Sequence, residues 1–291
     1  MLLRKREFAE LNYKSIFYKG KTIRQKIHQN ESFKPLPFAE LEDVAINSKC
    51  LANCSYCYTS ATKLGKNFDN VVEKALEVYG SMNMNERPYQ LAIGGAGEPT
   101  LHPDFPEFVK TISDLNILPN YTTNGMHLTD KVIEATQKYC GGVAVSYHPH
   151  IEKVFHKAIA QLTEAGIRTN IHFIVGEEGS SDKFFKLYDD LQNIGIEYFV
   201  LLPYQAVGRG KQINVIKEWD KLFKKLLTMK IKNMAFGALF YDYINNNDFQ
   251  KLDLDVYEPE VFSGYRMFDD SYKLLRKSSY DLKPKIDLVN V

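Results

Sequence analysis

The sequence predicts an α/β protein built on a parallel sheet that curls into an incomplete barrel of six strand–helix units. Between about residues 40 and 205, short apolar and β-branched runs alternate with segments of helical period. After the first unit these runs begin roughly every 25–30 residues, the length of a βαβ repeat. Polar or cysteine-containing segments follow the first three runs. Chemistry collects at that end of the strands in a parallel barrel, which favours a barrel over an open doubly wound sheet.

A strand is expected wherever a short apolar run is bounded by turn residues. The six runs are Val44–Asn47, Gln90–Ile93, Ile117–Thr122, Val143–Tyr147, Thr169–Val175 and Tyr198–Leu202. Because helical segments alternate with them, the strands are expected to be parallel and joined by right-handed crossovers. The first strand is not followed by Gly-x-Gly-x-x-Gly, which disfavours a dinucleotide-binding sheet.

Two helices are predicted to begin with a capping box, in which an N-cap side chain and an acid three residues later bond main-chain amides. Asn70 with Glu73 would open the helix after the first strand, and Asp104 with Glu107 the helix after the second. Gly166 is expected to end a later helix.

Residues 1–39 are expected to form an N-terminal arm. As far as Pro35 the arm has nine Lys or Arg residues and three Asp or Glu residues. Such a basic segment with interleaved aromatics can bind nucleic acid or a peptide. The favoured interpretation is a hairpin of Tyr13–Tyr18 and Thr22–Ile27 around Lys19-Gly20, with solvated lysines.

The barrel is expected to span residues 40–205, and a C-terminal α/β extension, residues 206–291, to cover it. Net charge is +1, and no apolar stretch reaches the length of a membrane helix. No apolar segment follows the N-terminal charges, so no secretory signal is predicted. Clustered cysteines suit metal binding in a reducing compartment better than disulfides, so we expect a cytoplasmic protein without membrane contact.

Three of the four cysteines lie within eight positions, at Cys50, Cys54 and Cys57. A structural zinc site needs four protein ligands, and the fourth would have to be His102 or Cys140. A [4Fe–4S] cluster is normally held by four thiolates. Three would leave one iron open, as catalytic metal sites do. The spacing therefore favours a cluster with an open iron, and zinc stays an alternative.

The three cysteines, with Tyr56 directly before the last, resemble the signature of the radical S-adenosylmethionine (radical SAM) enzymes. Residues 95–103, GAGEPTLHP, are similar to that family's Gly-Gly-Glu-Pro motif, and residues 122–125, TTNG, to its third-strand motif. The resemblance implies a partial (β/α)6 TIM-like barrel, a [4Fe–4S] cluster on the three cysteines, and SAM on the fourth iron. It also implies reductive cleavage of SAM to a 5′-deoxyadenosyl radical, which takes hydrogen from a substrate.

The resemblance also implies which residues contact SAM. They are Tyr56, Gly95, Ala96, Gly97, Glu98, Pro99, Asn124, Ser146, Asn170 and Arg209. Ala96 stands where the family has glycine, and Glu98 is expected mainly to brace its turn. Structural roles stay open for the turn residue Asn124, for Ser146 and Asn170 on their strands, and for Arg209 in its glycine loop. His148, His150 and His172 are candidates for substrate contact, and no catalytic residue is assigned.

Three functions remain open at this point. The first is a single-cluster radical SAM enzyme acting on an undetermined substrate, which can be a peptide, a protein or RNA, with flavodoxin or ferredoxin as electron donor. The second is an activase of a glycyl-radical enzyme, and the third a non-catalytic zinc or Fe–S module. No cysteine follows Cys140 in this sequence, so residues 141–291 are not expected to hold auxiliary clusters.

Overall fold

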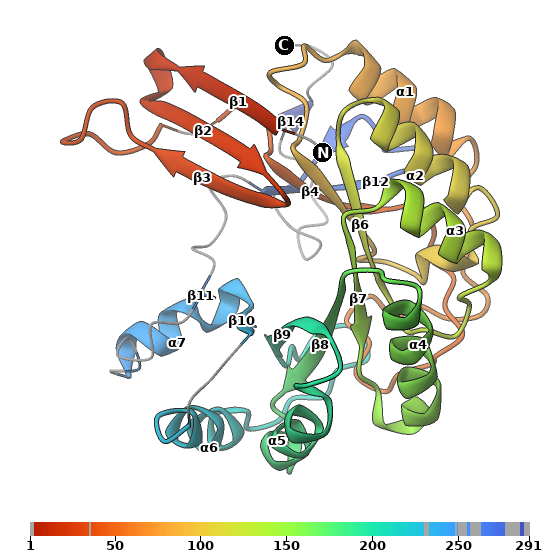
Figure 1. Cartoon of the computed structure of the whole chain (residues 1–291), viewed down its shortest axis with the longest axis vertical. Coiled ribbons are helices and arrows are strands. Elements are labelled where there is room, and N and C mark those ends of the chain that lie inside the picture. Colours follow the sequence, from red (N-terminus) through yellow and green to blue (C-terminus); the bar gives the residue numbers. More distant parts are fainter. Residues whose placement is uncertain are drawn as a thin grey trace.

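The computed structural model describes residues 3–34, 36–229, 233–247, 249, 255–256, 263–276 and 286–287. Its centre is a strongly curved parallel sheet, which has nine strands in these residues (Figure 1). The strands are β4 (Leu41–Ala45), β5 (Gln90–Ile93), β6 (Leu118–Thr123), β7 (Gly142–Ser146), β8 (Thr169–Val175), β9 (Ile196–Pro203), β10 (Met234–Phe236), β11 (Asp255–Val256) and β12 (Ser263–Met267). Their order is β11-β10-β9-β8-β7-β6-β5-β4-β12.

The six predicted strands are confirmed as β4 to β9, in sequential order. Five helices connect them and lie along the convex side of the sheet (Figure 1). They are α1 (Val71–Ser81), α2 (Phe105–Asp114), α3 (Asp130–Tyr139), α4 (Glu152–Glu164) and α5 (Ser180–Leu191). Since these helices cover one face, the sheet is a partial barrel, as predicted, and not a doubly wound sheet.

Side-chain alternation along each strand separates the apolar core from a more polar concave face. In β8, Ile171 and Phe173 are buried in the core with the helices, whereas Asn170 and His172 alternate with them and are less buried. Asn120 of β6 and Gln90 of β5 follow the same rule and bond each other at 3.2 Å on this face. The concave face of the sheet therefore carries polar groups beside apolar ones such as Val200 and Leu202 of β9.

Both predicted capping boxes are wrong, although the two helices begin where predicted. Asn70 has a left-handed backbone (φ 54°) and makes no side-chain bond to α1, because an N-cap reaches its helix from an extended conformation. Asp104 also makes no cap bond, and its amide instead donates to Nδ1 of His102 at 3.1 Å. Thr129 caps α3 by accepting from the Val132 amide.

The N-terminal residues form an antiparallel sheet of β1 (Leu3–Phe8), β2 (Tyr13–Tyr18) and β3 (Lys21–Gln25), with a 3₁₀ turn at Ala9–Leu11. The predicted hairpin is confirmed as β2 and β3, and β1 was missed. This sheet packs on the barrel end where the strands begin, since Phe17 stacks on Tyr89 at 5.0 Å.

Two of the arm's arginines are buried in this contact. Arg4 donates to the carbonyls of Pro88 at 2.6 Å and Asn116 at 3.1 Å. The Arg6 guanidinium lies 3.8 Å from the centre of the Tyr89 ring. These two charges are thus used inside the molecule and are not displayed for a polyanion.

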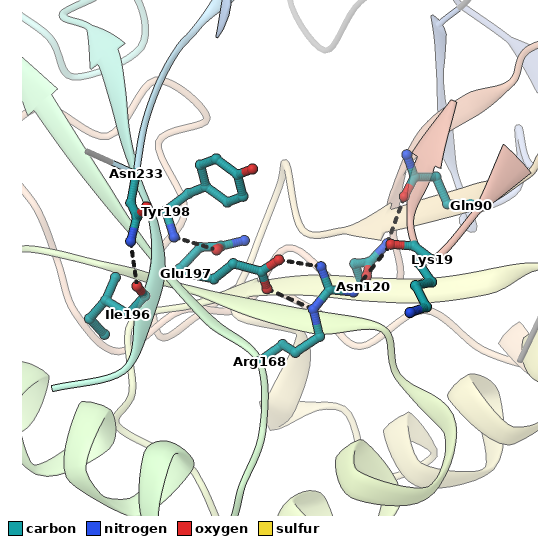
Figure 2. A network of polar contacts seen from close by, with 9 residues as sticks. Lys19, Gln90, Asn120, Arg168, Ile196, Glu197, Tyr198 and Asn233 are labelled. Carbon is teal, nitrogen blue, oxygen red and sulfur yellow. Dashed lines mark hydrogen bonds and ion pairs between the residues drawn. The ribbon is translucent and has the colours of Figure 1, made fainter. Parts of the chain in front are cut away.

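The hairpin tip is fixed to the same end of the barrel by Arg168 (Figure 2). Arg168 forms a two-pronged ion pair with Glu197 at 2.5 and 2.6 Å, and a longer contact of 3.5 Å to the Lys19 carbonyl. The pair thus joins the residue just before β8 to the start of β9.

The residues after 205 extend the sheet at both edges. Beyond β9 follow α6 (Ile216–Leu226), β10, a 3₁₀ turn (Ala238–Phe240) and α7 (Tyr241–Asn246). At the other edge β12 pairs with β4, and the short strands β13 (Leu274–Leu275) and β14 (Ile286–Asp287) pair with each other. The described segments contain no helix long and apolar enough to cross a bilayer.

Candidate functional site

The three clustered cysteines lie in a long loop between β4 and α1, where the chain leaves the carboxyl end of β4. All three are free thiols. Burial, together with a smaller effect of the nearby Cys50 and Cys57, raises the pKa of Cys54 to about 12. The three thiols are therefore close enough to influence one another's charge. A bound metal would have to displace their protons, since thiolates are the ligating form.

Arg209 holds this cysteine loop from the turn after β9. Its Nε donates to the Cys54 carbonyl and its Nη1 to the Ala61 carbonyl, both at 2.9 Å. Its main-chain amide donates to the Cys57 carbonyl at 2.9 Å. Gly208 makes this approach possible, because a Cβ there would lie 2.3 Å from the main-chain carbonyl oxygen of Tyr58. The position of Arg209 supports a bracing role for its side chain.

Two histidines after β7 also contact the cysteine loop. The Tyr56 hydroxyl lies 2.9 Å from Nδ1 of His148, and Nε2 of His150 lies 2.7 Å from the Ala52 carbonyl. Burial, with a smaller effect of His150, lowers the pKa of His148 to about 4. His148 is therefore neutral near pH 7, so its Nδ1 can accept from Tyr56.

The turn after β5, residues 94–98, touches the loop through main-chain oxygens. Thr59 donates to the Ala96 carbonyl at 2.7 Å, and Tyr58 to the Gly95 carbonyl at 3.1 Å. A Cβ on Gly97 would lie 2.5 Å from Oδ1 of Asn47 and 2.6 Å from the Lys49 oxygen. Glycine is required at 97 because two backbones meet there.

Glu98 joins the ends of three strands. Its carboxylate is buried and accepts from the Thr123 hydroxyl and the Asn124 amide, both at 2.8 Å, and from the Thr100 hydroxyl at 2.7 Å. Its main-chain amide donates to the Lys49 carbonyl at 2.8 Å, just before Cys50. Burial raises the pKa of Glu98, while these hydrogen bonds oppose the shift. Pro99 follows as the first residue of a 3₁₀ turn (Pro99–Leu101).

Asn124 links the end of β6 to the first cysteine. Its Nδ2 lies 3.5 Å from the Cys50 sulfur, and its Oδ1 accepts from the Met126 amide at 2.9 Å. Asn124 thus makes the turn that its sequence position predicts and also faces the sulfur.

The remaining predicted residues lie on the concave face of β7 and β8. Ser146 and His172 occupy register positions opposite each other on β7 and β8. Asn170 accepts from the Tyr198 amide at 3.1 Å, where β8 and β9 shift register. Burial lowers the pKa of His172 to about 4, so it is neutral near pH 7.

Comparison with protein families decides which family the chain belongs to. The sequence profile of the Radical SAM superfamily matches residues 44–204, more than half of the chain. The chain belongs to the radical SAM superfamily. The match spans β4 to β9 together with the cysteine loop.

Solved structures with a similar fold include other radical SAM enzymes. Streptococcus suis SuiB bound to S-adenosylmethionine is 16% identical with a TM-score of 0.65, covering 87% of this chain and 65% of SuiB. Its complex with the precursor peptide SuiA gives a TM-score of 0.64. The enzyme anSMEcpe with bound AdoMet and the Cp18Cys peptide is 15% identical with a TM-score of 0.58, covering 84% of this chain and 75% of anSMEcpe.

Among curated proteins, 7,8-dihydro-6-hydroxymethylpterin dimethyltransferase of Methanocaldococcus jannaschii is 28% identical over 89 residues. That alignment covers 30% of this chain and 18% of the relative. The chain therefore spans less than two thirds of both SuiB and this methyltransferase.

The donor set fits a radical SAM cluster better than zinc. The two candidate distant zinc ligands are engaged elsewhere: His102 bonds through both ring nitrogens, to the Phe68 carbonyl and the Asp104 amide. Cys140 lies at the opposite end of the barrel beside Thr136. No group of three or more His, Cys, Asp or Glu side chains in the described ranges is placed to hold one metal ion. In a [4Fe–4S] cluster each thiolate binds a different iron, so the three sulfurs do not have to meet at a single metal ion.

Sequence reasoning missed several residues of this site. Tyr58 and Thr59 carry no motif, yet they hold the 94–98 turn. Tyr265 of β12 also reaches the turn, since its ring lies 3.2 Å from the position of a Cβ on Gly95. Thr59 lies only two positions after Cys57, so its place beside the cysteine motif was a weak indication that it belongs to the site. Nothing in the sequence indicates that Tyr265 contacts Gly95.

Proposed function

We propose that Cys50, Cys54 and Cys57 hold a [4Fe–4S] cluster whose fourth iron is open to SAM. When bound, this cluster would supply the electron that cleaves SAM to methionine and a 5′-deoxyadenosyl radical, which takes hydrogen from the substrate. The observation that carries the proposal is the Glu98 network, which ties the cysteine loop to the ends of β5 and β6.

In this proposal the protein's own residues position the reactants. Asn124 donates toward the Cys50 sulfur, which would stabilise a thiolate there. The turn of Gly95, Ala96 and Gly97, between Glu98 and the cysteine loop, would face the methionyl end of SAM. Tyr56, Ser146, Asn170 and Pro99 complete the proposed SAM contacts, and Arg209 acts mainly by fixing the loop.

We further propose that the substrate is a peptide or a segment of a protein. The support is analogy: two of the similar folds, SuiB and anSMEcpe, were solved with peptides. The burial of Arg4 and Arg6 removes part of the charge that favoured RNA. No comparison supports a glycyl-radical activase. Residues 40–205 would form the catalytic barrel of a cytoplasmic enzyme, flanked by segments 1–39 and 206–291, with flavodoxin or ferredoxin as electron donor.

Product analysis tests the proposal. Protein reconstituted with iron and sulfide without oxygen, then mixed with dithionite and SAM, should release 5′-deoxyadenosine and methionine, detected by mass spectrometry. A Cys54→Ala variant should release neither. Cell extract should increase the release, and treating the extract with protease but not with ribonuclease should remove that increase. A loss with ribonuclease alone would contradict the peptide assignment.

A further inference from the structure

A buried ion pair fixes the register of β12 against β4. Arg266 Nε lies 3.0 Å from Glu42 Oε2, and both side chains are almost wholly buried on the convex side of the sheet. Tyr79 donates to the same carboxylate oxygen at 2.8 Å. An unpaired charge in this position would be costly, so the strand cannot slip by one residue without breaking the pair.

Because side chains alternate, the same register places two other residues together on the concave face. Asp43 and Tyr265 are direct partners in the parallel pairing of β4 and β12. Tyr265 is buried, and its ring edge lies 3.2 Å from the position of a Cβ on Gly95. The two residues therefore lie beside the turn that we propose for SAM.

The Asp43 carboxylate has no hydrogen-bond or ion-pair partner among the described residues. Its neighbour on the other side, across the β4–β5 pairing, is the small Ala92. The side chain is solvent-exposed, yet it lies deep in the curve of the sheet, where limited hydration raises its pKa to about 6. An accessible acid surrounded by protein is what the wall of a binding hollow presents.

The rest of this face does not neutralise Asp43. Its polar residues in the described strands are the amides Gln90, Asn120 and Asn170, hydroxyl groups, and the neutral His172. Where β8 and β9 begin, the charge of Arg168 is matched by Glu197 (Figure 2). Arg276, which pairs with Tyr265, donates to the Ser271 hydroxyl at 2.8 Å and forms no ion pair with Asp43. Asp43 is thus an acid without an ion-pair partner in the part of the chain that the structure describes.

We infer that Asp43 anchors a positively charged side chain, lysine or arginine, of the peptide substrate, with Tyr265 packing along it. This inference rests on the proposed peptide function. The carboxylate supplies the charge complement, and the aromatic ring beside it favours an alkylammonium or guanidinium group. The anchored residue lies beside the Gly95 turn, so Asp43 sets which part of the peptide faces SAM. Asp43 is a positioning residue and takes no part in breaking bonds.

Selection from a random peptide library tests this assignment, because it does not require the substrate to be identified. Reconstituted holoenzyme with SAM, kept oxygen-free and unreduced, is immobilised and used to enrich displayed peptides. The same selection is run with Asp43→Asn, Asp43→Glu, Asp43→Lys and the control Asp189→Asn, whose acid lies exposed on α5. Equilibrium dialysis measures SAM affinity for each protein, and thermal unfolding checks that each is folded.

The wild-type, Asp43→Glu and Asp189→Asn proteins should enrich Lys or Arg at one peptide position by about fivefold, the effect of a partly screened ion pair. Asp43→Asn should lose that preference, and Asp43→Lys should replace it with Asp or Glu. A role in folding alone would not reverse the charge preference.

An unchanged Lys or Arg preference in folded Asp43→Asn would overturn the inference. So would a fall of more than about tenfold in its SAM affinity, which would assign the carboxylate to the SAM amino group. If no protein enriches any peptide above bare support, the peptide function fails and the inference fails with it. That outcome differs from failure of Asp43 alone, in which the same motif is enriched with and without the acid.

Discussion

The buried Glu98 carboxylate accepts a 2.8 Å hydrogen bond from the main-chain amide of Asn124. This bond connects the turn after β5 to the turn after β6. The Asn124 side chain also faces the sulfur of Cys50. The amide of Glu98 completes the link by donating to the carbonyl of Lys49. The geometry of the cysteine loop therefore depends on an acid that touches no cysteine.

Replacing Glu98 should damage the fold and the site together. In Glu98→Ala, the Asn124 amide and the two threonine hydroxyls lose their buried acceptor, at a cost of about 2–4 kcal/mol. Glu134→Ala, at an exposed position of α3, should change stability by less than about 0.5 kcal/mol. Urea unfolding and iron content measure the two effects, and equal stability of the two variants would contradict the network.

Gly97 should not tolerate even one methyl group. A Cβ there would lie 2.5 Å from Oδ1 of Asn47, so Gly97→Ala has to push the 94–98 turn away from the cysteine loop. We expect iron content after reconstitution to fall severalfold. Gly80→Ala is the matched control, because no atom lies within 4 Å of its Cβ position and alanine should stabilise α1 by up to about 1 kcal/mol. If Gly97→Ala took up as much iron as the wild type, the close approach of the 94–98 turn to the cysteine loop would not be needed for the site.

Features that depend on local pattern were predictable from the sequence. Gln90–Ile93 and Thr169–Val175 are strands with the predicted bounds, because their short apolar runs are bounded by turn residues. The helix starts near Asn70 and Asp104 were also correct. Their caps were not, because a capping box states which residues can bond, whereas the backbone angles at Asn70 decide whether they do.

Features that depend on distant pairing were not predictable. Nothing in β12 signals that it lies against β4, because their register is set by the ion pair of Arg266 and Glu42, which are far apart in the sequence. The buried roles of Arg4 and Arg6 were hidden for the same reason, since a basic residue in sequence resembles a solvated one. Motifs indicated the cysteines, Glu98 and Asn124, whereas Tyr58, Thr59, Asp43 and Tyr265 have meaning only in the folded chain.

Arg4 should anchor the N-terminal sheet to the barrel. Arg4→Ala removes donors from the carbonyls of Pro88, Asn116 and Arg87, which we expect to cost about 2–4 kcal/mol. Amide hydrogen exchange across residues 3–25 should become faster by a factor of ten or more. Lys5→Ala, on the same strand but facing solvent, should leave the exchange unchanged. Equal exchange in both variants would mean that the aromatic stacking of Phe17 is sufficient.

Acid should weaken the fold through His172. Its pKa is lowered from 6.5 to about 4 by burial. As the pH falls below 6.5, the unfolded chain therefore binds a proton that the folded chain does not, and stability is lost progressively down to about pH 4. Between pH 7 and pH 5, the free energy of unfolding of His172→Asn should fall by about 1–2 kcal/mol less than that of the wild type. Urea unfolding at the two pH values measures this difference, and His156→Asn, exposed on α4, should behave as the wild type does. If His172→Asn lost as much stability in acid as the wild type, His172 would not be the cause of the acid effect.

Electron paramagnetic resonance of the reduced protein tests the central claim most directly. Protein reconstituted without oxygen and reduced with dithionite should contain about four irons and show the signal of one reduced [4Fe–4S] cluster. Addition of SAM should change that signal, because SAM would ligate the open iron. Substituting alanine for Cys50, Cys54 or Cys57 should remove both the signal and the change. A cluster signal that SAM leaves unaltered, or one that survives the loss of any of these cysteines, would contradict the account.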